Sequence, residues 1–295
     1  MSNKLIIITG LTTSGKSSIA MEIAKKYNGE IISCDSVQVY KGLDIGSAKE
    51  SIENRKIIKH HLIDIVEPKE NFNVGDFIKK AKEAISECVS RGKLPIICGG
   101  TIMYIKALLE GYTLGSISNP EFREYWENQA EKYGKISVWN ALNEKDPELA
   151  SHVHYNNLKR VIRYLEMSTF GAPKTQDSIL KDFDVLSVGI NLEKDKIYPI
   201  IDKRVDEMIS SGLENEVKTL INKNLTLENN SMNTIGYREM YSYLKGEIDY
   251  ERCVSLIKQH TRNYAKRQLT FMKSIKGIKI VSIEEARKLI EEFLN

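Results

Sequence analysis

A glycine-rich loop follows the first apolar segment of this chain of 295 residues. The loop is Gly10-Leu11-Thr12-Thr13-Ser14-Gly15-Lys16-Ser17, and it comes directly after Leu5-Ile6-Ile7-Ile8. In this GxxxxGK[ST] pattern the glycines let backbone N–H groups turn toward an anion, the lysine adds a charge, and the serine hydroxyl can ligate Mg²⁺. Apolar residues then recur at helical spacing until Asn28-Gly29. The chain is therefore predicted to begin with a strand, a phosphate-binding loop and a helix.

Strand and helix patterns alternate from residue 1 to about residue 112. The predicted strands are Lys4–Thr9, Glu30–Cys34 and Leu94–Cys98. This alternation predicts a parallel sheet with helical crossovers. Ligands bind at the carboxyl ends of the strands in such sheets. Functional side chains are therefore expected at Gly10–Ser17, Asp35–Gln38 and Gly99–Tyr104.

The pattern changes after Gly111, where a turn-rich link leads into helical segments. An apolar strand pattern returns only at Val185–Ile190. The predicted fold class is α/β, a P-loop parallel-sheet core with a mainly helical insertion domain and a helical C-terminal part. The predicted divisions are residues 1–114 for the first part of the core, 115–182 for the helical insertion, and 183–295 for the return to the core with the C-terminal helices.

Composition limits the class of protein. The 43 basic and 40 acidic residues give a net charge of only +3, so any nucleic-acid-binding surface must be local. The four cysteines lie far apart with no CxxC pair, which predicts reduced buried thiols and no zinc site. The N-terminal apolar run is too short for a signal peptide or a membrane span. We expect a cytoplasmic protein without membrane association.

The loop alone does not identify the reaction. ATP and GTP hydrolases normally add an aspartate at the end of a second apolar strand to hold Mg²⁺. Here Leu94–Cys98 runs into Gly99-Gly100-Thr101, and Asp64 follows only the short pair Leu62-Ile63. An energy-transducing NTPase is therefore disfavoured, and a transferase acting on a di- or triphosphate is favoured.

Polar residues follow the second predicted strand at Asp35-Ser36-Val37-Gln38. An aspartate opposite the phosphate loop can accept a substrate hydrogen bond and take its proton, and Ser36 and Gln38 can contact the polar edges of a base. The alternative is that Asp35 only caps a short helix. The residues alone leave both interpretations open.

Basic residues gather late in the chain. Six lie between positions 262 and 279 without an acid, namely Arg262, Lys266, Arg267, Lys273, Lys276 and Lys279. Tyr264 and Phe271 are interleaved with them, a mixture that suits an RNA backbone with unstacked bases. A second cluster contains Lys159, Arg160 and Arg163. The alternative for each cluster is a solvated helix face.

These motifs together resemble the tRNA dimethylallyltransferases, also called tRNA isopentenyltransferases. The resemblance covers nearly the whole chain and follows the family order. The matching segments are Gly10–Ser17, Asp35–Tyr40, Asp44–Lys49, His60–Asp64, Leu94–Thr101, Arg160–Arg163, Ser211–Leu213 with Glu216-Val217, Ile235–Glu239 and Thr261–Gln268.

The resemblance implies transfer of the five-carbon group of dimethylallyl diphosphate to N6 of adenosine 37, beside the anticodon of tRNA, with release of pyrophosphate. The implied catalytic residues are Asp35, Thr101 and Lys16. Asp35 would accept the N6 proton, Thr101 would help to place the adenine and the bridging oxygen of the donor, and Lys16 would neutralise the leaving diphosphate together with a Mg²⁺ cofactor ligated by Ser17. The implied diphosphate-binding residues are Gly10, Thr12, Thr13, Ser14, Gly15, Lys16, Ser17 and Arg204.

The tRNA anticodon stem-loop is the implied macromolecular partner of a monomeric enzyme. The implied tRNA-binding residues are Asp35, Ser36, Val37, Gln38, Thr101, Arg123, Lys159, Arg160, Arg163, Arg262, Lys266 and Arg267. Two alternatives from the same loop are a small-molecule kinase and an isopentenyltransferase acting on free adenine nucleotides. The late basic residues disfavour the kinase, and the helical insertion with its basic residues favours tRNA over a free nucleotide.

The chain departs from the family pattern at four positions. Leu11, Ile102, Lys159 and Phe271 stand where proline, glycine, glutamine and tryptophan are common. Because a β-branched residue rarely adopts positive φ, Ile102 is expected to have negative φ at the start of a helix. Its side chain is expected either in the core or beside the prenyl tail of the donor.

Overall fold

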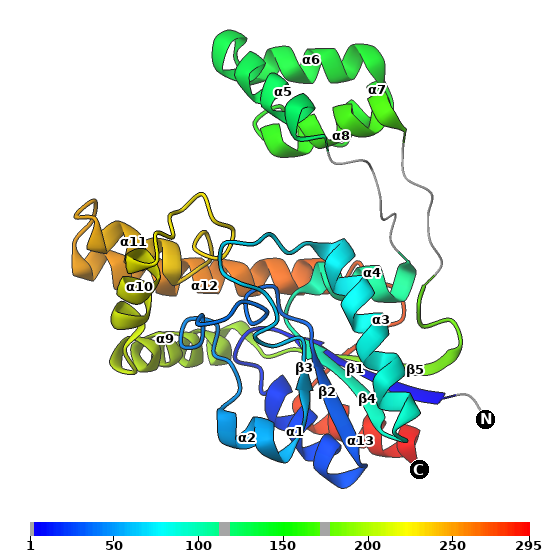
Figure 1. The fold of residues 1–295 in the computed structure, drawn as a ribbon. Coiled ribbons are helices and arrows are strands. Elements are labelled where there is room, and N and C mark those ends of the chain that lie inside the picture. Colours follow the sequence, from blue (N-terminus) through cyan, green and yellow to red (C-terminus); the bar gives the residue numbers. More distant parts are fainter. Residues whose placement is uncertain (1–2, 112–118, 172–177) are drawn as a thin grey trace. The chain divides into compact units, whose positions relative to one another are not determined.

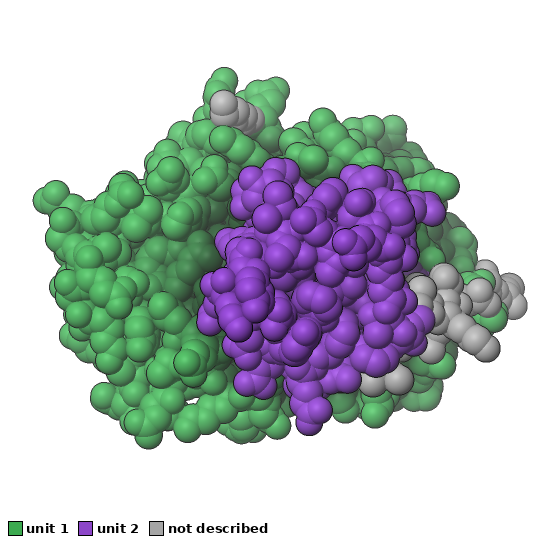
Figure 2. All heavy atoms as spheres, turned by 90° about the horizontal axis from the view of Figure 1, so that it is seen from above, with its two compact units in different colours: residues 1–110, 178–295 green, residues 111–177 purple. Residues whose placement is uncertain are grey.

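The computed structural model describes residues 3–111, 119–171 and 178–295. The chain divides into two compact units, coloured separately in Figure 2. Residues 1–110 and 178–295 form the core unit, and residues 111–177 form the insertion unit. The insertion begins and ends a few residues earlier than the predicted range 115–182. In the described part of the chain no helix is both long and apolar enough to cross a membrane.

The core unit contains a six-stranded parallel sheet in the order β3-β2-β4-β1-β5-β6 (Figure 1). The strands are β1 (Asn3–Gly10), β2 (Gly29–Ser33), β3 (His60–His61), β4 (Leu94–Gly99), β5 (Phe183–Ile190) and β6 (Lys279–Val281). The central strands are apolar runs because helices cover both of their faces. The predicted α/β fold class is confirmed. The sequence prediction missed the short edge strands β3 and β6.

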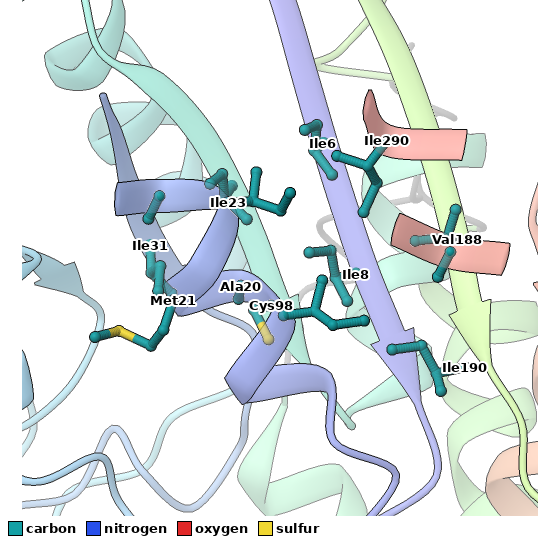
Figure 3. Packing of buried hydrophobic residues seen from close by; sticks show 14 of the residues in the cluster. Ile6, Ile8, Ala20, Met21, Ile23, Ile31, Cys98, Val188, Ile190 and Ile290 are labelled. Atoms are coloured by element: carbon teal, nitrogen blue, oxygen red, sulfur yellow. The ribbon is translucent and has the colours of Figure 1, made fainter. Parts of the chain in front are cut away.

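One face of the sheet packs against α1 (Lys16–Lys26) and α13 (Ile283–Leu294). Ile6 and Ile8 of β1 lie in this cluster with Ile23 of α1 and Ile290 of α13 (Figure 3). The alternating residues, such as Ile7, are equally buried because they point to the other face. There α3 (Val74–Ser90) and α4 (Ile102–Glu110) contact the strands.

The C-terminal helices build a second apolar cluster in the core unit. They are α9 (Lys194–Ser210), α10 (Leu213–Asn222), α11 (Tyr237–Leu244) and α12 (Tyr250–Met272). Val205, Val217, Met240 and Ile257 bury one side chain from each of these helices in this cluster. The cluster also includes Val39 and Leu43 from the loop after β2, which is followed by the short helix α2 (Ile52–Ile57). The helices are thereby fixed beside the carboxyl ends of the strands.

The insertion unit is helical, with α5 (Pro120–Tyr133), α6 (Lys135–Lys145), α7 (Pro147–Ser151) and α8 (Leu158–Phe170). Its own apolar core includes Val138, Leu142, Val161 and Leu165. The buried carboxylate of Glu166 accepts the backbone N–H of Asn119 and hydrogen bonds from two arginines. The unit therefore has both an apolar core and an internal ionic network.

Candidate active site

The predicted phosphate-binding loop, Gly10–Ser17, joins β1 to α1. Thr13 and Gly15 have positive φ values of 64° and 82°, an arrangement that turns successive backbone N–H groups into the loop. A positive φ at a threonine is strained, and such strain gathers at ligand-binding loops. The hydroxyl of Ser14 is buried and has no hydrogen-bond partner among the described residues. An anion in the loop would satisfy these donors together with the first N–H groups of α1.

Two cations meet at this loop. The Nζ of Lys16 donates to the carbonyl of Leu11 at 3.1 Å, and Arg204 comes from α9, far along the chain. Burial lowers the pKa of Lys16, and the nearby Arg204 lowers it further, although Cys98 and Asp35 oppose this. Burial also lowers the pKa of Arg204, which the neighbouring Asp35 partly offsets. Two cations that repel each other in a partly buried site stabilise an anion bound between them.

A cavity of about 370 Å³ lies over the loop. Its lining residues are Thr13, Ser14, Gly15, Lys16, Ser17, Ser18, Ile200, Lys203, Arg204 and Glu207. The structure therefore brings the predicted Arg204 to the phosphate-binding loop. Lys203, which the sequence analysis did not name, is exposed at the same cavity.

Ser17 fits the predicted role of a Mg²⁺ ligand. Ser17 lies in the first turn of α1 and is one of the residues that line the cavity over the loop. Within the described residues the one group of three metal-ligating side chains lies elsewhere, at Glu30, His61 and Cys88. Mg²⁺ commonly takes one or two protein ligands and completes its shell with phosphate oxygens and water. A single hydroxyl beside a predicted diphosphate site is consistent with this coordination.

Asp35 follows β2 and lines a second cavity of about 290 Å³. Its Oδ1 accepts the backbone N–H groups of Val37 at 2.8 Å and Gln38 at 3.2 Å. The carboxylate therefore caps the turn, as the structural alternative proposed. Among the described residues Oδ2 has no hydrogen-bond partner. The carboxylate is consequently held in place by one oxygen while the other can accept a proton.

Thr101 links the loop after β4 to the loop after β2. Its hydroxyl accepts the backbone N–H of Ser36 at 3.0 Å, and its own N–H donates to the carbonyl of Cys34 at 3.2 Å. The structure therefore brings Thr101 next to the residue that follows Asp35. Gly99 has no room for a side chain, because a Cβ there would lie 2.1 Å from the carbonyl oxygen of Cys34.

The second cavity adjoins the first through Arg204, which lines both. It is lined by residues that the sequence analysis assigned to the site and by others that it did not. The full lining is Thr12, Asp35, Ser36, Val37, Gly46, Ser47, Arg204, Val205, Met208, Asn233, Thr234, Ile235, Gly236, Arg238, Ile257, Thr261, Tyr264 and Arg267. Several of the others lie in Asp44–Lys49 and Ile235–Glu239, two segments that match the family and have no predicted role. Their match to the family is the sequence signal that could have identified them.

Glu216 shapes one wall of this cavity. Its carboxylate accepts the backbone N–H groups of Asp44, Ile45 and Gly46 and the hydroxyl of Tyr237 at 2.6 Å. A Cβ on Gly46 would lie 2.5 Å from the Tyr237 ring, so this wall needs glycine. The loop at 44–46 is therefore fixed by a residue of α10 about 170 positions later.

The predicted tRNA-binding residues of α12 lie in two environments. Lys266 and Arg267 are exposed, and Arg267 also lines the second cavity. Arg262 lies 3.6 Å from the carboxylate of Asp202 and its guanidinium is 5.8 Å from the ring centroid of Tyr198. The exposed pair therefore retains the charge that RNA phosphates require.

In the insertion unit the four predicted tRNA-binding cations also differ. Lys159 and Arg160 are exposed, and the Arg160 guanidinium lies 5.2 Å from the ring centroid of Tyr164. Arg123 and Arg163 each lie 2.7 Å from the buried carboxylate of Glu166. Burial raises the pKa of Glu166, but the bonds from the arginines outweigh it and lower the pKa. Arg123 and Arg163 thus have a structural role that the sequence analysis did not foresee.

The group of Glu30, His61 and Cys88 lies at the opposite, amino end of the sheet. The carboxylate of Glu30 lies 2.7 Å from His61 Nε2 and 2.7 Å from the Arg91 guanidinium. Burial raises the pKa of Glu30, but hydrogen bonds from Arg91 and His61 outweigh it and lower the pKa to about 2. Because Arg91 already supplies the positive charge, this group is an ion-pair network. All four cysteines of the chain are free and buried, which confirms the prediction for the thiols.

Ile102 begins α4 and is 3% exposed. It is not among the described residues with positive φ, which confirms the predicted backbone conformation. It does not line either cavity of the site. Of the two environments expected for its side chain, the structure supports the core.

Comparison with known proteins agrees with the geometry. The sequence model of the family described as IPP transferase matches residues 38–275. A tRNA dimethylallyltransferase of Caldanaerobacter subterraneus subsp. tengcongensis is 40% identical over 100% of this chain and 98% of its own length. The tRNA dimethylallyltransferase 2 of Geotalea daltonii is 42% identical over 96% of this chain and 89% of its own length.

Solved structures give the same result. A full-length tRNA isopentenylpyrophosphate transferase from Bacillus halodurans is similar with a TM-score of 0.73 and 36% identity, covering 99% of this chain and 95% of that one. A eukaryotic dimethylallyltransferase acting on tRNA is similar with a TM-score of 0.82 and 28% identity, covering 99% of this chain and 80% of that one. The chain belongs to the IPP transferase family.

Proposed function

We propose that the protein transfers the dimethylallyl group of dimethylallyl diphosphate to N6 of adenosine 37 in the anticodon stem-loop of tRNA. The observation that carries the proposal is the pair of adjoining cavities. One holds the phosphate-binding loop with Lys16, the other holds Asp35, and Arg204 lines both. A diphosphate in the first cavity and an adenine in the second would meet beside Arg204. Relatives named tRNA dimethylallyltransferase support the donor and the acceptor.

The reaction exchanges a carbon–oxygen bond for a carbon–nitrogen bond and transfers one proton. The N6 nitrogen attacks C1 of the dimethylallyl group, the bond from C1 to the bridging oxygen breaks, and pyrophosphate leaves with the bonding electrons. Asp35 accepts the proton that N6 loses, through the oxygen that its turn leaves free. Lys16, Arg204 and the loop N–H groups stabilise the charge that develops on the leaving diphosphate. Mg²⁺ held by Ser17 would add further neutralisation of that charge when bound.

The second cavity suits a planar base with both apolar and polar edges. Val205, Met208 and Ile257 offer apolar surface, and Ser36 and Thr234 offer hydroxyl groups. The exposed Lys266 and Arg267 would hold the phosphates of the stem-loop. The substrate tRNA implies action in the cytoplasm.

One assay tests the proposal. The protein is incubated with dimethylallyl diphosphate and an unmodified anticodon stem-loop, and the RNA is examined by mass spectrometry for a five-carbon increase. A stem-loop with guanosine at position 37 lacks the exocyclic N6 and serves as the control. Product from free AMP and none from the stem-loop would contradict the tRNA acceptor. Phosphate transfer from ATP to a small molecule, with no prenyl transfer, would contradict the reaction itself.

A further inference from the structure

One buried side chain joins the two loops that the proposed reaction uses. Gln268 lies on α12 and is 3% exposed. Its Oε1 accepts the backbone N–H of Thr12 at 2.9 Å, and its Nε2 donates to the carbonyl of Gly100 at 2.8 Å. Thr12 belongs to the phosphate-binding loop, and Gly100 directly precedes Thr101. A single amide therefore spans the diphosphate loop and the loop after β4.

The Gly100 carbonyl belongs to a chain of contacts that leads to Asp35, the proposed base. Gly100 also accepts the hydroxyl of Tyr264 at 3.2 Å, and the Thr101 hydroxyl accepts the N–H of Ser36, the residue after Asp35. Hydrogen bonds and adjacent residues therefore connect the turn of Asp35 to the phosphate-binding loop without a gap. The contact at Gln268 is close, because a Cβ on Gly100 would lie 2.6 Å from Gln268 Nε2.

Glutamine suits this position because its planar amide offers an acceptor and a donor at once. One loop presents an N–H and the other a carbonyl, so a residue that only donates or only accepts would lose one of the two bonds that join the loops. The bond to Gly100 is buried and the bond to Thr12 is partly buried, and an unmade hydrogen bond is costly where water is excluded. The pairing fixes the distance between the loops more tightly than apolar packing would.

We propose that Gln268 is a positioning residue, which holds the diphosphate loop and the loop of Thr101 in register so that C1 of the donor faces N6 of the acceptor. This inference rests on the proposed function. Reacting atoms must approach in line, and a displacement of about 1 Å can lower the rate by about 10²-fold. Gln268 itself touches neither substrate in this role. Its removal should lower the rate of the chemical step more than the affinity for either substrate.

The first variant is Gln268→Met, which keeps the length of the side chain and removes both hydrogen bonds. At saturating donor and stem-loop, the single-turnover rate should fall by about 10- to 100-fold. Dissociation constants for pyrophosphate and for the stem-loop should change little. Gln259 lies exposed on the same helix, so Gln259→Met is the matched control and should keep the wild-type rate.

The second variant is Gln268→Glu. Its carboxylate still accepts the N–H of Thr12 but cannot donate to Gly100, whereas the protonated acid can do both. The rate of this variant relative to wild type should therefore rise as pH falls. A residue that only fills space would give a ratio that does not depend on pH. If the methionine variant fails to fold, this pH dependence decides the question.

Amide hydrogen exchange gives a readout without catalysis. The N–H of Thr12 should exchange faster in Gln268→Met than in wild type, because its acceptor is gone. Unchanged exchange at Thr12, a wild-type single-turnover rate, or a loss confined to substrate affinity would each overturn the proposal. If wild-type protein transferred no prenyl group, the proposed function would fail, and exchange at Thr12 would still decide whether Gln268 holds the loop.

Discussion

Replacing Asp35 with asparagine separates its two roles. The carbonyl oxygen of asparagine can accept the same bonds that Oδ1 now accepts from Val37 and Gln38, so the turn should persist. The amide cannot take a proton from N6. Loss of a positioned general base lowers turnover by roughly 10²- to 10⁴-fold. That range corresponds to about 2.7 to 5.4 kcal/mol of lost transition-state stabilisation.

The assay is single-turnover prenyl transfer at saturating donor and stem-loop, with tRNA affinity and the thermal midpoint measured in parallel. For Asp35→Asn both parallel values should stay near wild type. The companion variant Asp35→Ala also loses the turn cap, which should lower stability by about 0.5 to 2 kcal/mol. A near-normal rate for Asp35→Asn would refute the base assignment and leave Asp35 as a cap alone.

Three further outcomes are expected. Glu30→Gln should lower the free energy of unfolding at pH 7 by up to about 3 kcal/mol, because the pKa of Glu30 falls from 4.5 to about 2 on folding. A carboxylate whose pKa is lowered on folding stabilises the protein at pH values above its unfolded pKa. Urea titrations should therefore show that the difference in unfolding free energy between the variant and wild type vanishes as the pH falls from about 4.5 to about 2. A difference that stays constant with pH would contradict the ion-pair account. Changing Lys266 and Arg267 to glutamine should flatten the salt dependence of stem-loop binding by up to about 0.7 per lost phosphate contact, and an unchanged slope would mean that this helix faces elsewhere. Ile102→Gly should lower stability by at least about 2 kcal/mol and leave the product ratio from competing five- and ten-carbon diphosphates unaltered, whereas a shifted ratio would place its side chain beside the donor.

Local pattern was enough to predict the central sheet. Leu5–Ile8 and Leu94–Cys98 are short apolar runs that lead into Thr9-Gly10 and Gly99, and such runs are typical of strands that are buried on both faces. The strands that were missed contain two and three residues, β3 at His60–His61 and β6 at Lys279–Val281. Strands this short carry no detectable alternation. They exist because the backbones of β2 and β5 offer them hydrogen bonds.

The site residues that directly follow a strand could be predicted from the sequence. The phosphate-binding loop, Asp35 and Thr101 all lie at carboxyl ends of parallel strands, which topology brings to one edge. Arg204 came from the family resemblance, since nothing in the pattern of α9 marks it. Glu216 and Gln268 could not be predicted from local pattern. Each acts on a loop more than 100 positions away, and only tertiary packing brings them there.

Not every basic residue of this protein is available to bind a phosphate, because some are already paired with a carboxylate. Arg123 and Arg163 resemble surface cations in sequence, but both neutralise the buried Glu166, and removing one partner of a buried pair typically costs about 3 to 5 kcal/mol. An RNA phosphate would have to compete with that pairing. Lys266 and Arg267 form no ion pair within the described residues, and their cationic groups lie over the rings of Tyr198 and Tyr264. A phosphate meets no competing carboxylate there, so the exposed face of α12 should contribute more to the salt-dependent part of tRNA binding than an equal number of cations in the insertion.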